Sequence, residues 1–175
     1  MSSSPQILSD AIRNVPDFPK PGIQFKDITP ILSNPVLFQN AIDALIKPHQ
    51  PGEIEQVAGI DARGFIFASA AALRLNAGFV PIRKKGKLPY NTHEESYDLE
   101  YGSNTVEVHT DAFSPGAKVL LVDDLLATGG TALAALKLLK RLKAQVVEAV
   151  FLVELTFLNA REKISHIPTR TIISY

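Results

Sequence analysis

The stretch from Val119 to Leu136 combines residue types that could hold a sugar phosphate. Four apolar residues are followed by the carboxylates Asp123 and Asp124, and Ala-Thr-Gly-Gly-Thr then leads into an apolar-rich segment. Amides at a helix start point outward and carry partial positive charge, and glycines let the backbone approach an anion closely. This order of strand, acidic pair, turn and helix predicts a monophosphate cradle made by Ala127, Thr128, Gly129, Gly130 and Thr131.

The two carboxylates suggest what the phosphate is attached to. A carboxylate repels phosphate but accepts hydrogen bonds from neutral hydroxyls, so a ribose 5-phosphate would suit Asp123, Asp124 and the cradle together. The alternative is that Asp124 caps a helix and the glycines form an ordinary turn. The spacing matches neither a Walker loop nor a dinucleotide fingerprint, because both Gly-Lys-Ser/Thr and Gly-x-Gly-x-x-Gly are absent.

Composition limits the partners of the chain. It has 175 residues, which suits a single domain, and its 18 basic and 18 acidic residues cancel. A neutral chain gives no general reason to bind nucleic acid or an anionic membrane. There is no cysteine for a disulfide or a thiolate nucleophile. Neither a signal peptide nor an apolar run of about 18 residues is present, so we expect a cytoplasmic protein.

The elements that must position these residues alternate between strand and helix. Helices are expected from near Ser4 to Val15, from Pro35 after an Asn34 cap, over 65–75 and around 133–142. Strands are expected over 56–60, 79–82, 105–109, 118–122, 146–153 and 171–173. The strands are rich in Val, Ile and Leu, which indicates an α/β fold with a parallel sheet covered on both faces.

Three segments that carry chemistry follow strands of this sheet. They are DARG (61–64), RKKGK (83–87) and DDLLATGGT (123–131). Ligands of such sheets bind outside the carboxyl ends of the strands, so we expect the three segments to meet at one edge. The polar stretch 83–102 has little periodicity, which favours a functional loop or lid.

The chain resembles the adenine phosphoribosyltransferases, within the type I purine/pyrimidine phosphoribosyltransferase family. The resemblance is carried by VDDLLATGGT, FPKPGIQFKDITPIL, IDARGF, RKKGKLP, SYDLEYG and VELTFL, which occur in the family's order over nearly the whole chain. It implies a Rossmann-like twisted parallel sheet flanked by helices. It also implies an N-terminal hood over residues 1–33 and a core over 34–175, with a flexible catalytic loop at about 84–104.

The resemblance further implies a reaction. The 5-phosphoribosyl group of phosphoribosyl pyrophosphate passes to N9 of adenine, giving AMP and pyrophosphate in purine salvage. Mg²⁺ is the implied cofactor, held mainly by the substrate and not by protein ligands. The implied assembly is a homodimer, and the implied partners exclude nucleic acid and membrane.

Residue roles follow from the matching segments. Arg63, Lys84 and Lys87 correspond to pyrophosphate-binding positions. From their residue types alone, Arg63 could equally form a structural salt bridge, and the lysines could belong to a solvated face. The adenine-binding positions are Ile23, Phe25, Lys26 and Leu126; without the resemblance, Phe25 would be read as a core residue.

Glu100 matches a glutamate of the family that approaches N7 of adenine. The resemblance makes it catalytic, together with Asp123 and Asp124. It would donate a proton when the base leaves and accept the N7 proton in the other direction. Its pKa would have to rise when the loop closes and excludes water. The alternative is a solvated loop carboxylate.

Two other functions remain open from the sequence. One is a related transferase for a 6-oxopurine, although no lysine or arginine is obviously placed opposite the 6-oxo group. The other is a non-catalytic sensor of phosphoribosyl pyrophosphate. Sensors of that kind usually carry a DNA-binding domain, for which the chain has neither the length nor a basic patch.

Overall fold

The computed structural model describes residues 4–98 and 102–175. Its helices are α1 (Ser4–Ala11), α2 (Thr29–Ser33), α3 (Pro35–Ile46), α4 (Gly64–Leu75), α5 (Gly130–Arg141), α6 (Ala160–Lys163) and the 3-10 helix η1 (Thr156–Leu158). Its strands are β1 (Arg13–Pro16), β2 (Gln24–Asp27), β3 (Gln56–Ile60), β4 (Gly78–Lys84), β5 (Thr92–Asp98), β6 (Ser103–His109), β7 (Lys118–Leu126), β8 (Gln145–Glu154) and β9 (Thr169–Ser174).

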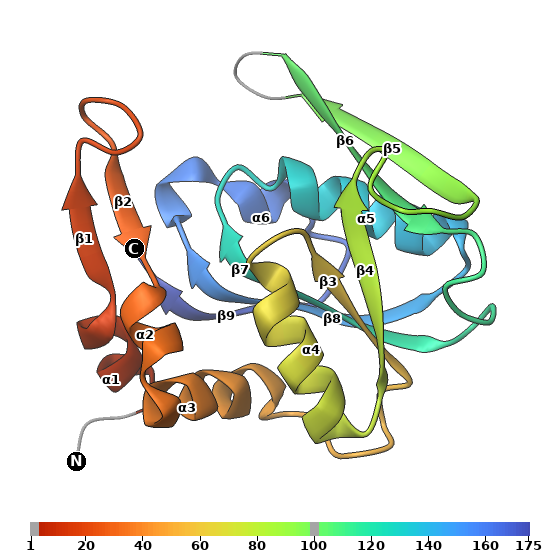
Figure 1. The fold of residues 1–175 in the computed structure, drawn as a ribbon, viewed down its shortest axis with the longest axis horizontal. Coiled ribbons are helices and arrows are strands. Elements are labelled where there is room, and N and C mark those ends of the chain that lie inside the picture. Colours follow the sequence, from red (N-terminus) through yellow and green to blue (C-terminus); the bar gives the residue numbers. More distant parts are fainter. Residues whose placement is uncertain (1–3, 99–101) are drawn as a thin grey trace.

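A seven-stranded sheet in the order β5-β6-β4-β3-β7-β8-β9 forms the centre of the molecule (Figure 1). The pairs from β4 through β3, β7 and β8 to β9 are parallel, whereas β6 pairs antiparallel with both β4 and β5. The α/β fold with a mainly parallel sheet is thus confirmed. Its β5–β6 edge is an antiparallel hairpin that the sequence did not indicate.

Alternate residues of the central strands face two separate cores. In β7, Val119 and Leu121 pack with α5 on one face, while Leu120 and Val122 pack with α3 and α4 on the other. All four are fully buried. A strand buried on both faces must be apolar throughout, which explains the unbroken VLLV run before the acidic pair.

Several expected elements are confirmed. Asn34 caps α3, with its side-chain oxygen accepting from the amides of Val36 and Leu37. The strand predicted over 56–60 has the bounds of β3, and those predicted near 118, 146 and 171 correspond to β7, β8 and β9. The chemistry-bearing carboxylates Asp123 and Asp124 lie inside β7, which continues to Leu126.

Three expectations were wrong. The first helix ends at Ala11, and residues up to Pro16 form β1 instead, because they pair with β2. Part of the stretch 83–102 is a strand and not a loop, because Thr92–Asp98 forms β5. This strand lies over α5, where Lys137 donates to Glu95, and its many polar residues did not indicate a strand. The alternating sequence of 105–109 predicts an exposed strand, but Val106, Glu107 and Val108 of β6 are buried.

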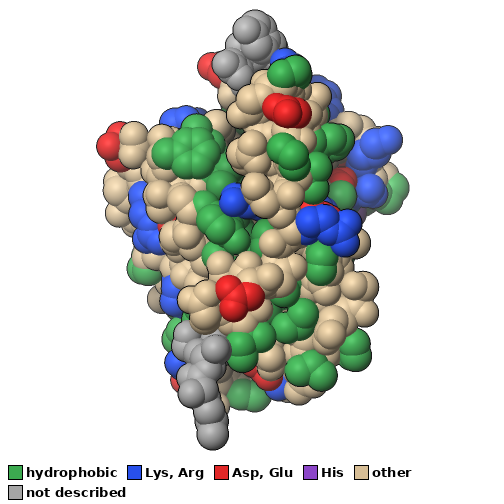
Figure 2. All heavy atoms as spheres, turned by 90° about the vertical axis from the view of Figure 1, so that its left-hand side faces the viewer, with side chains coloured by type: hydrophobic (Ala, Val, Ile, Leu, Met, Phe, Trp, Pro, Cys, Tyr) green, Lys and Arg blue, Asp and Glu red, His purple; other side chains and the backbone are tan. Residues whose placement is uncertain are grey.

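The β1–β2 hairpin forms a small sheet of its own beside the main sheet (Figure 1). Figure 2 looks onto this side of the molecule, where hydrophobic, basic and acidic side chains are interspersed. In the described part of the chain, no helix combines the length and the apolar character needed to span a membrane.

Candidate sugar-phosphate site

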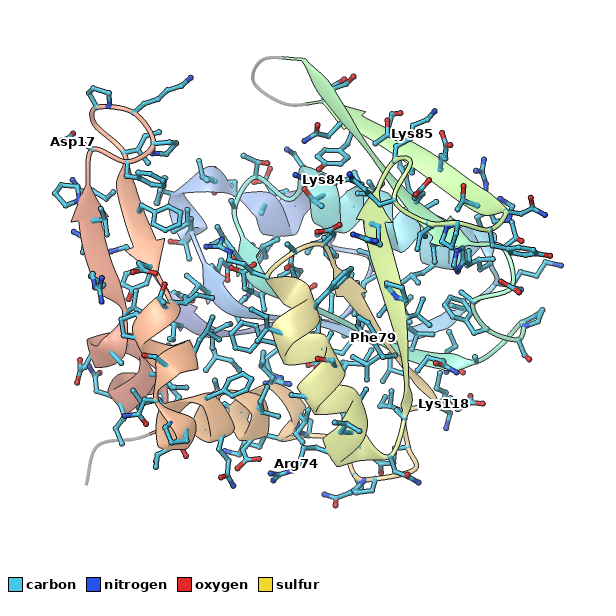
Figure 3. All side chains as sticks on the ribbon, in the orientation of Figure 1. Asp17, Arg74, Phe79, Lys84, Lys85 and Lys118 are labelled. Carbon is cyan, nitrogen blue, oxygen red and sulfur yellow. The ribbon has the colours of Figure 1, made fainter. Side chains whose placement is uncertain are left out.

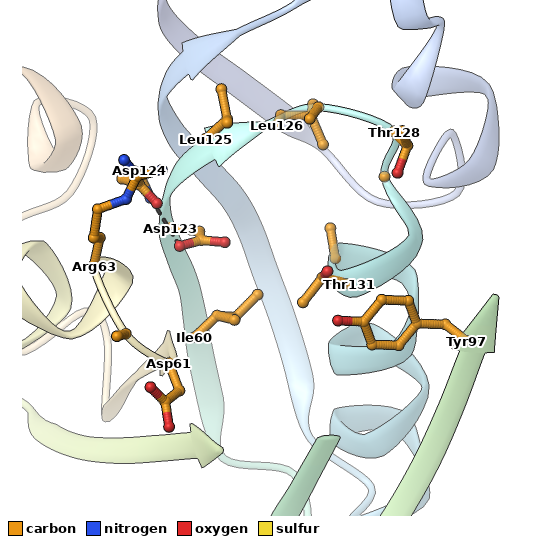
Figure 4. Close-up of a pocket in the computed structure, with 14 residues that line it drawn as sticks. Ile60, Asp61, Arg63, Tyr97, Asp123, Asp124, Leu125, Leu126, Thr128 and Thr131 are labelled. Atoms are coloured by element: carbon orange, nitrogen blue, oxygen red, sulfur yellow. Dashed lines mark hydrogen bonds and ion pairs between the residues drawn. The ribbon is translucent and has the colours of Figure 1, made fainter. Parts of the chain in front are cut away.

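A cavity of about 360 Å³ opens where β3 and β7 end (Figure 4). The segments after these parallel strands meet there, as predicted for DARG and DDLLATGGT. The residues that line it are Ile60, Asp61, Ala62, Arg63, Tyr97, Asp123, Asp124, Leu125, Leu126, Ala127, Thr128, Gly129, Thr131 and Ala132.

The turn before α5 has the geometry of an anion cradle. Gly129 caps the helix with φ of +78°, a conformation that favours glycine. A Cβ at Gly129 would also lie 3.0 Å from the carbonyl oxygen of Ala160. Because the first amides of a helix have no acceptor within it, those of Gly130 and Thr131 are free for a ligand. Residues 127–131 therefore form the turn and helix start in which the cradle is predicted.

Asp123, Asp124 and Arg63 form a charged group on one wall of the cavity. Nε of Arg63 lies 2.8 Å from Oδ2 of Asp124, and the amide of Asp124 donates to Oδ1 of Asp123 at 2.9 Å (Figure 4). A Cβ at Gly64 would lie 2.5 Å from that same Oδ1, so a residue with a side chain would displace Asp123. Arg63, for which a salt bridge and pyrophosphate binding were both open, makes the salt bridge in this structure.

Burial sets the protonation behaviour of the acidic pair. Desolvation raises the pKa of Asp123 well above its ordinary value, and the adjacent charge of Asp124 raises it further. Desolvation also raises the pKa of Asp124, although the Arg63 guanidinium opposes the rise. The pair therefore carries charge at some energetic cost, which hydroxyl donors from a ligand would reduce.

The predicted adenine-binding positions differ in how they lie relative to the cavity. Leu126 lines it, and the guanidinium carbon of Arg63 lies 5.6 Å from the centre of the Phe25 ring. The Phe25 ring packs edge-on against Phe18 at 5.1 Å and is only partly buried. Ile23 is exposed, while the ammonium of Lys26 turns to the Tyr175 ring at 3.8 Å.

The lysine segment lies beside the cavity and does not line it. Lys84 ends β4, and Lys84 and Lys85 lie at the same end of that strand in Figure 3. The turn at 84–87 is held by Arg83, which donates to the carbonyl oxygen of Lys87 at 3.0 Å and to Oδ2 of Asp61 at 3.2 Å. The RKKGK segment is therefore joined to the cavity by Arg83, whose partner Asp61 lines it.

Buried Glu107 holds the lysine segment in place through hydrogen bonds from backbone amides. Its Oε1 accepts from the amides of Lys87 at 2.9 Å and Leu88 at 2.8 Å. These backbone hydrogen bonds outweigh burial and lower the pKa of Glu107. A carboxylate with several donors of this kind stabilises the turn that presents Lys84 and Lys87.

Two cavity residues with polar side chains were missed by the sequence analysis. Asp61 was quoted in its motif without a role, although its carboxylate faces Arg83. Tyr97 comes from β5, and its hydroxyl points into the cavity across from Arg63 (Figure 4). A Cβ at Gly130 would lie 3.1 Å from the Tyr97 ring, so the two residues are in close contact. Glu100, predicted as the catalytic acid, lies outside the described residues.

The carboxylates of the cavity can be compared with the ligands that the expected magnesium ion needs. Within residues 4–98 and 102–175, no group of three or more His, Asp or Glu side chains is close enough to enclose a metal. Asp61, Asp123 and Asp124 nevertheless line one cavity, and carboxylate oxygens are ligands that Mg²⁺ accepts. These residues fit an ion that brings most of its own ligands, as Mg²⁺ on a pyrophosphate does.

Known proteins resemble the chain in sequence and in fold. Residues 27–171 match the model of the phosphoribosyl transferase domain. The chain is 54% identical to an adenine phosphoribosyltransferase of Thermobifida fusca over 173 residues, which cover 98% of each chain. The crystal structure of an adenine phosphoribosyltransferase from Rhodothermus marinus superposes with a TM-score of 0.92 at 53% identity, covering 98% of each chain.

A yeast structure adds information about ligands. The adenine phosphoribosyltransferase of Saccharomyces cerevisiae, complexed with D-2,5-dideoxy-2,5-imino-altritol 1,6-bisphosphate and adenine, has a TM-score of 0.92 and 41% identity. The match covers 98% of this chain and 99% of the yeast chain. That relative therefore takes a base and a bisphosphate at the same time.

Proposed function

Because the chain belongs to the phosphoribosyl transferase family, we propose that it transfers the 5-phosphoribosyl group of phosphoribosyl pyrophosphate to N9 of adenine. The products are AMP and pyrophosphate, and the reaction returns free adenine to the nucleotide pool. One observation carries the proposal: the cradle, the acidic pair and Arg63 line a single cavity, with the Phe25 ring beside Arg63. The chain is also similar over nearly its whole length to adenine phosphoribosyltransferases.

The sugar phosphate is held at two ends. Backbone amides of 127–131 and the hydroxyls of Thr128 and Thr131 bind the 5′-phosphate, because the helix start offers unpaired donors and positive potential. Asp123 and Asp124 accept hydrogen bonds from the 2′- and 3′-hydroxyls of the ribose. The raised pKa values of the pair favour this arrangement, since each hydroxyl donor compensates for lost hydration.

The pyrophosphate binds on the side of the cavity where β3 and β4 end. Arg63 can contact two phosphate oxygens at once, and Lys84 and Lys87 add positive charge from the neighbouring turn. When bound, Mg²⁺ supplies further charge neutralisation for the pyrophosphate, and we propose that the substrate holds it mainly. Arg63 exchanges part of its contact with Asp124 for the phosphate, leaving the Asp124 carboxylate to the ribose.

Adenine lies at the mouth of the cavity under the β1–β2 hairpin, which serves as the hood. Phe25 stacks on the ring from one side and Leu126 packs against it from the other. Backbone groups of Ile23 and of Phe25 or Lys26 read the purine edge, because the amino group and ring nitrogen of adenine need one acceptor and one donor.

The chemistry is a displacement at the anomeric carbon. The bond to pyrophosphate breaks with its electron pair leaving on oxygen, and the lone pair of N9 forms the new carbon–nitrogen bond. Asp123 and Asp124 stabilise the positive charge that develops on the ribose ring. Glu100 takes the N7 proton of adenine in this direction and returns it in the reverse reaction. Residues of the 84–104 loop exclude water from the reacting centre.

The proposal extends to assembly and location. We propose a homodimer in the cytoplasm, as the family resemblance implies, and sedimentation equilibrium of the purified chain would test the dimer directly. A monomer at all concentrations with full activity would contradict it.

A substrate panel tests the proposed function. The protein is incubated with phosphoribosyl pyrophosphate, Mg²⁺ and one base at a time, and AMP, GMP, IMP and XMP are measured separately. We expect AMP from adenine alone and no product without Mg²⁺. Products from the 6-oxopurines alone would overturn the choice of base, and binding of phosphoribosyl pyrophosphate with no nucleotide from any base would indicate a sensor.

A further inference from the structure

The phosphate cradle rests on α6, a short helix near the C-terminus that the family motifs do not include in the site. Nζ of Lys163 donates a hydrogen bond of 2.8 Å to the carbonyl oxygen of Thr128, in the middle of the cradle. On the same helix, the backbone of Ala160 lies so close to Gly129 that a Cβ there would be 3.0 Å from the Ala160 oxygen. Helix α6 therefore contacts the cradle at two successive residues.

The contact with Lys163 controls the direction of a ligand-facing amide. A trans peptide unit is planar, and its carbonyl oxygen and amide hydrogen point in opposite directions. When Lys163 fixes the Thr128 carbonyl on the side of α6, the Gly129 amide is turned to the other side. Gly129 and Thr128 both line the cavity, whereas Lys163 borders the neighbouring cavity between β5 and α5.

Helix α6 is itself anchored to the sheet. Arg161 donates from Nε and Nη2 to the two carboxylate oxygens of Glu154, each at 2.8 Å. It also donates to the carbonyl oxygen of Thr169 at 3.1 Å and to Oγ1 of Thr171 at 2.9 Å. Glu154 is buried at the end of β8, and Thr169 and Thr171 belong to the edge strand β9, so the anchor joins α6 to two neighbouring strands of the sheet. Such a bidentate pair defines orientation as well as distance.

We propose that Lys163 is a positioning residue for the 5′-phosphate. It orients the peptide unit between Thr128 and Gly129 so that the Gly129 amide faces the phosphate, and it neutralises a carbonyl dipole that would otherwise repel the anion. Its ammonium also places a positive charge behind the cradle without touching the ligand. This inference rests on the proposed function, because it assigns the group that the cradle binds.

Nucleotide binding with and without the phosphate tests the inference. Dissociation constants for AMP and for adenosine are measured by calorimetry on the full chain, in the wild type, Lys163→Met, Lys163→Arg and the control Lys140→Met. Lys140 lies at the end of α5, away from the cradle. We expect Lys163→Met to weaken AMP binding about tenfold, as for loss of a charge-assisted hydrogen bond, and to leave adenosine binding unchanged. Lys163→Arg recovers most of the AMP affinity, and Lys140→Met resembles the wild type.

Other results would overturn the inference. Unchanged AMP binding in Lys163→Met would mean that the cradle holds its shape without Lys163. Equal weakening of AMP and adenosine would mean a general structural role. The proposed function would survive either result, because the wild type would still prefer AMP. A wild type that binds AMP no better than adenosine would instead contradict the phosphate cradle itself, and the inference with it.

Discussion

Carboxylates at the ends of two adjacent strands behave in opposite ways. Glu154 ends β8 and is paired in register with Leu126 of β7, only two residues beyond Asp124. Its oxygens accept from Arg161 and Thr171, and the Arg161 hydrogen bonds lower its pKa. Asp123 and Asp124, by contrast, have raised pKa values because burial outweighs the contacts that they receive.

The difference separates a structural carboxylate from one that serves a ligand. Glu154 receives its hydrogen bonds from the chain, so its burial stabilises the fold. Asp123 and Asp124 keep acceptor capacity directed at the cavity, so their burial costs stability until hydroxyl groups arrive. Substitutions at the two places should therefore have opposite effects on folding, and only those on β7 should primarily affect turnover.

The largest expected effect is on the stability of a Glu154→Leu variant. The substitution leaves Arg161 and Thr171 without their acceptor and should lower the free energy of unfolding by about 3 kcal/mol, the lower end of the range for a broken buried pair, because Arg161 is half exposed. Urea unfolding measures the change. Glu162→Gln serves as the control and should resemble the wild type, because Glu162 is exposed on α6, the helix that carries Arg161. Equal stability of both variants would remove the distinction between the two regions.

A second expected effect concerns turnover in Asp123→Asn. The amide is a weaker acceptor for ribose hydroxyls and carries no charge to stabilise the developing oxocarbenium ion. We expect kcat/KM for phosphoribosyl pyrophosphate to fall about 100-fold, as for loss of a charged hydrogen-bond partner. Steady-state kinetics at saturating adenine measures it. A fall of less than threefold would mean that Asp123 does not contact the sugar.

A smaller effect is expected for Phe25→Leu, which separates a role of Phe25 in adenine binding from a role in the fold. Loss of ring stacking should raise KM for adenine about tenfold, since base–aromatic stacking contributes roughly 1–3 kcal/mol. The free energy of unfolding should change little because the ring is only partly buried. If KM for adenine stays the same while stability falls, Phe25 is a core residue, the alternative that its sequence left open.

The pH dependence of stability should distinguish the two carboxylate types by sign. Asp123 has a raised pKa when folded, so its ionisation disfavours folding as the pH rises, and the free energy of unfolding of Asp123→Asn should exceed that of the wild type at pH 7. Glu154 has a lowered pKa when folded, so its stabilisation is present above the unfolded value of about 4.3 and is lost as the pH falls through the folded pKa. Urea unfolding from pH 7 to 3 measures both effects. At pH 7 the free energy of unfolding should be higher than that of the wild type in Asp123→Asn and lower in Glu154→Leu, and both differences should shrink as the pH falls.

The smallest expected effect is that of Lys85→Met. Lys85 is exposed and its pKa is raised by a hydrogen bond to Glu94, a surface pair of the kind that contributes little. Neither stability nor KM for pyrophosphate in the reverse reaction should change measurably, whereas Lys87→Met should raise that KM. Equal effects of the two substitutions would mean that the lysine segment acts only through its total charge.

Features encoded by neighbouring residues could be predicted from the sequence. The acidic pair, the Gly129 turn and α5 lie within one stretch, and the central strands are apolar because both of their faces are buried. Strand β5 was missed because its polar sequence, THEESYD, takes its shape from pairing with β6 and packing on α5. Short β1 was assigned to a helix because its partner lies about ten residues further along the chain.

The sequence predicted that segments after different strands would meet at one edge of the sheet, but not which of their distant residues would be in contact. Lys163 meets Thr128 across 35 positions, and Arg83 meets Asp61 across 22. Tyr97 enters the cavity only because the β5–β6 hairpin folds over the start of α5. Two adjacent aspartates suggest coupled ionisation, but the direction of their pKa shifts depends on burial, which the fold creates.

A crystal structure of the protein with AMP would show where each part of the nucleotide binds. We expect the phosphate on the amides of 127–131, the ribose hydroxyls on Asp123 and Asp124, and the adenine ring against Phe25. Density for the phosphate at any other place, or for the base away from Phe25, would contradict this arrangement.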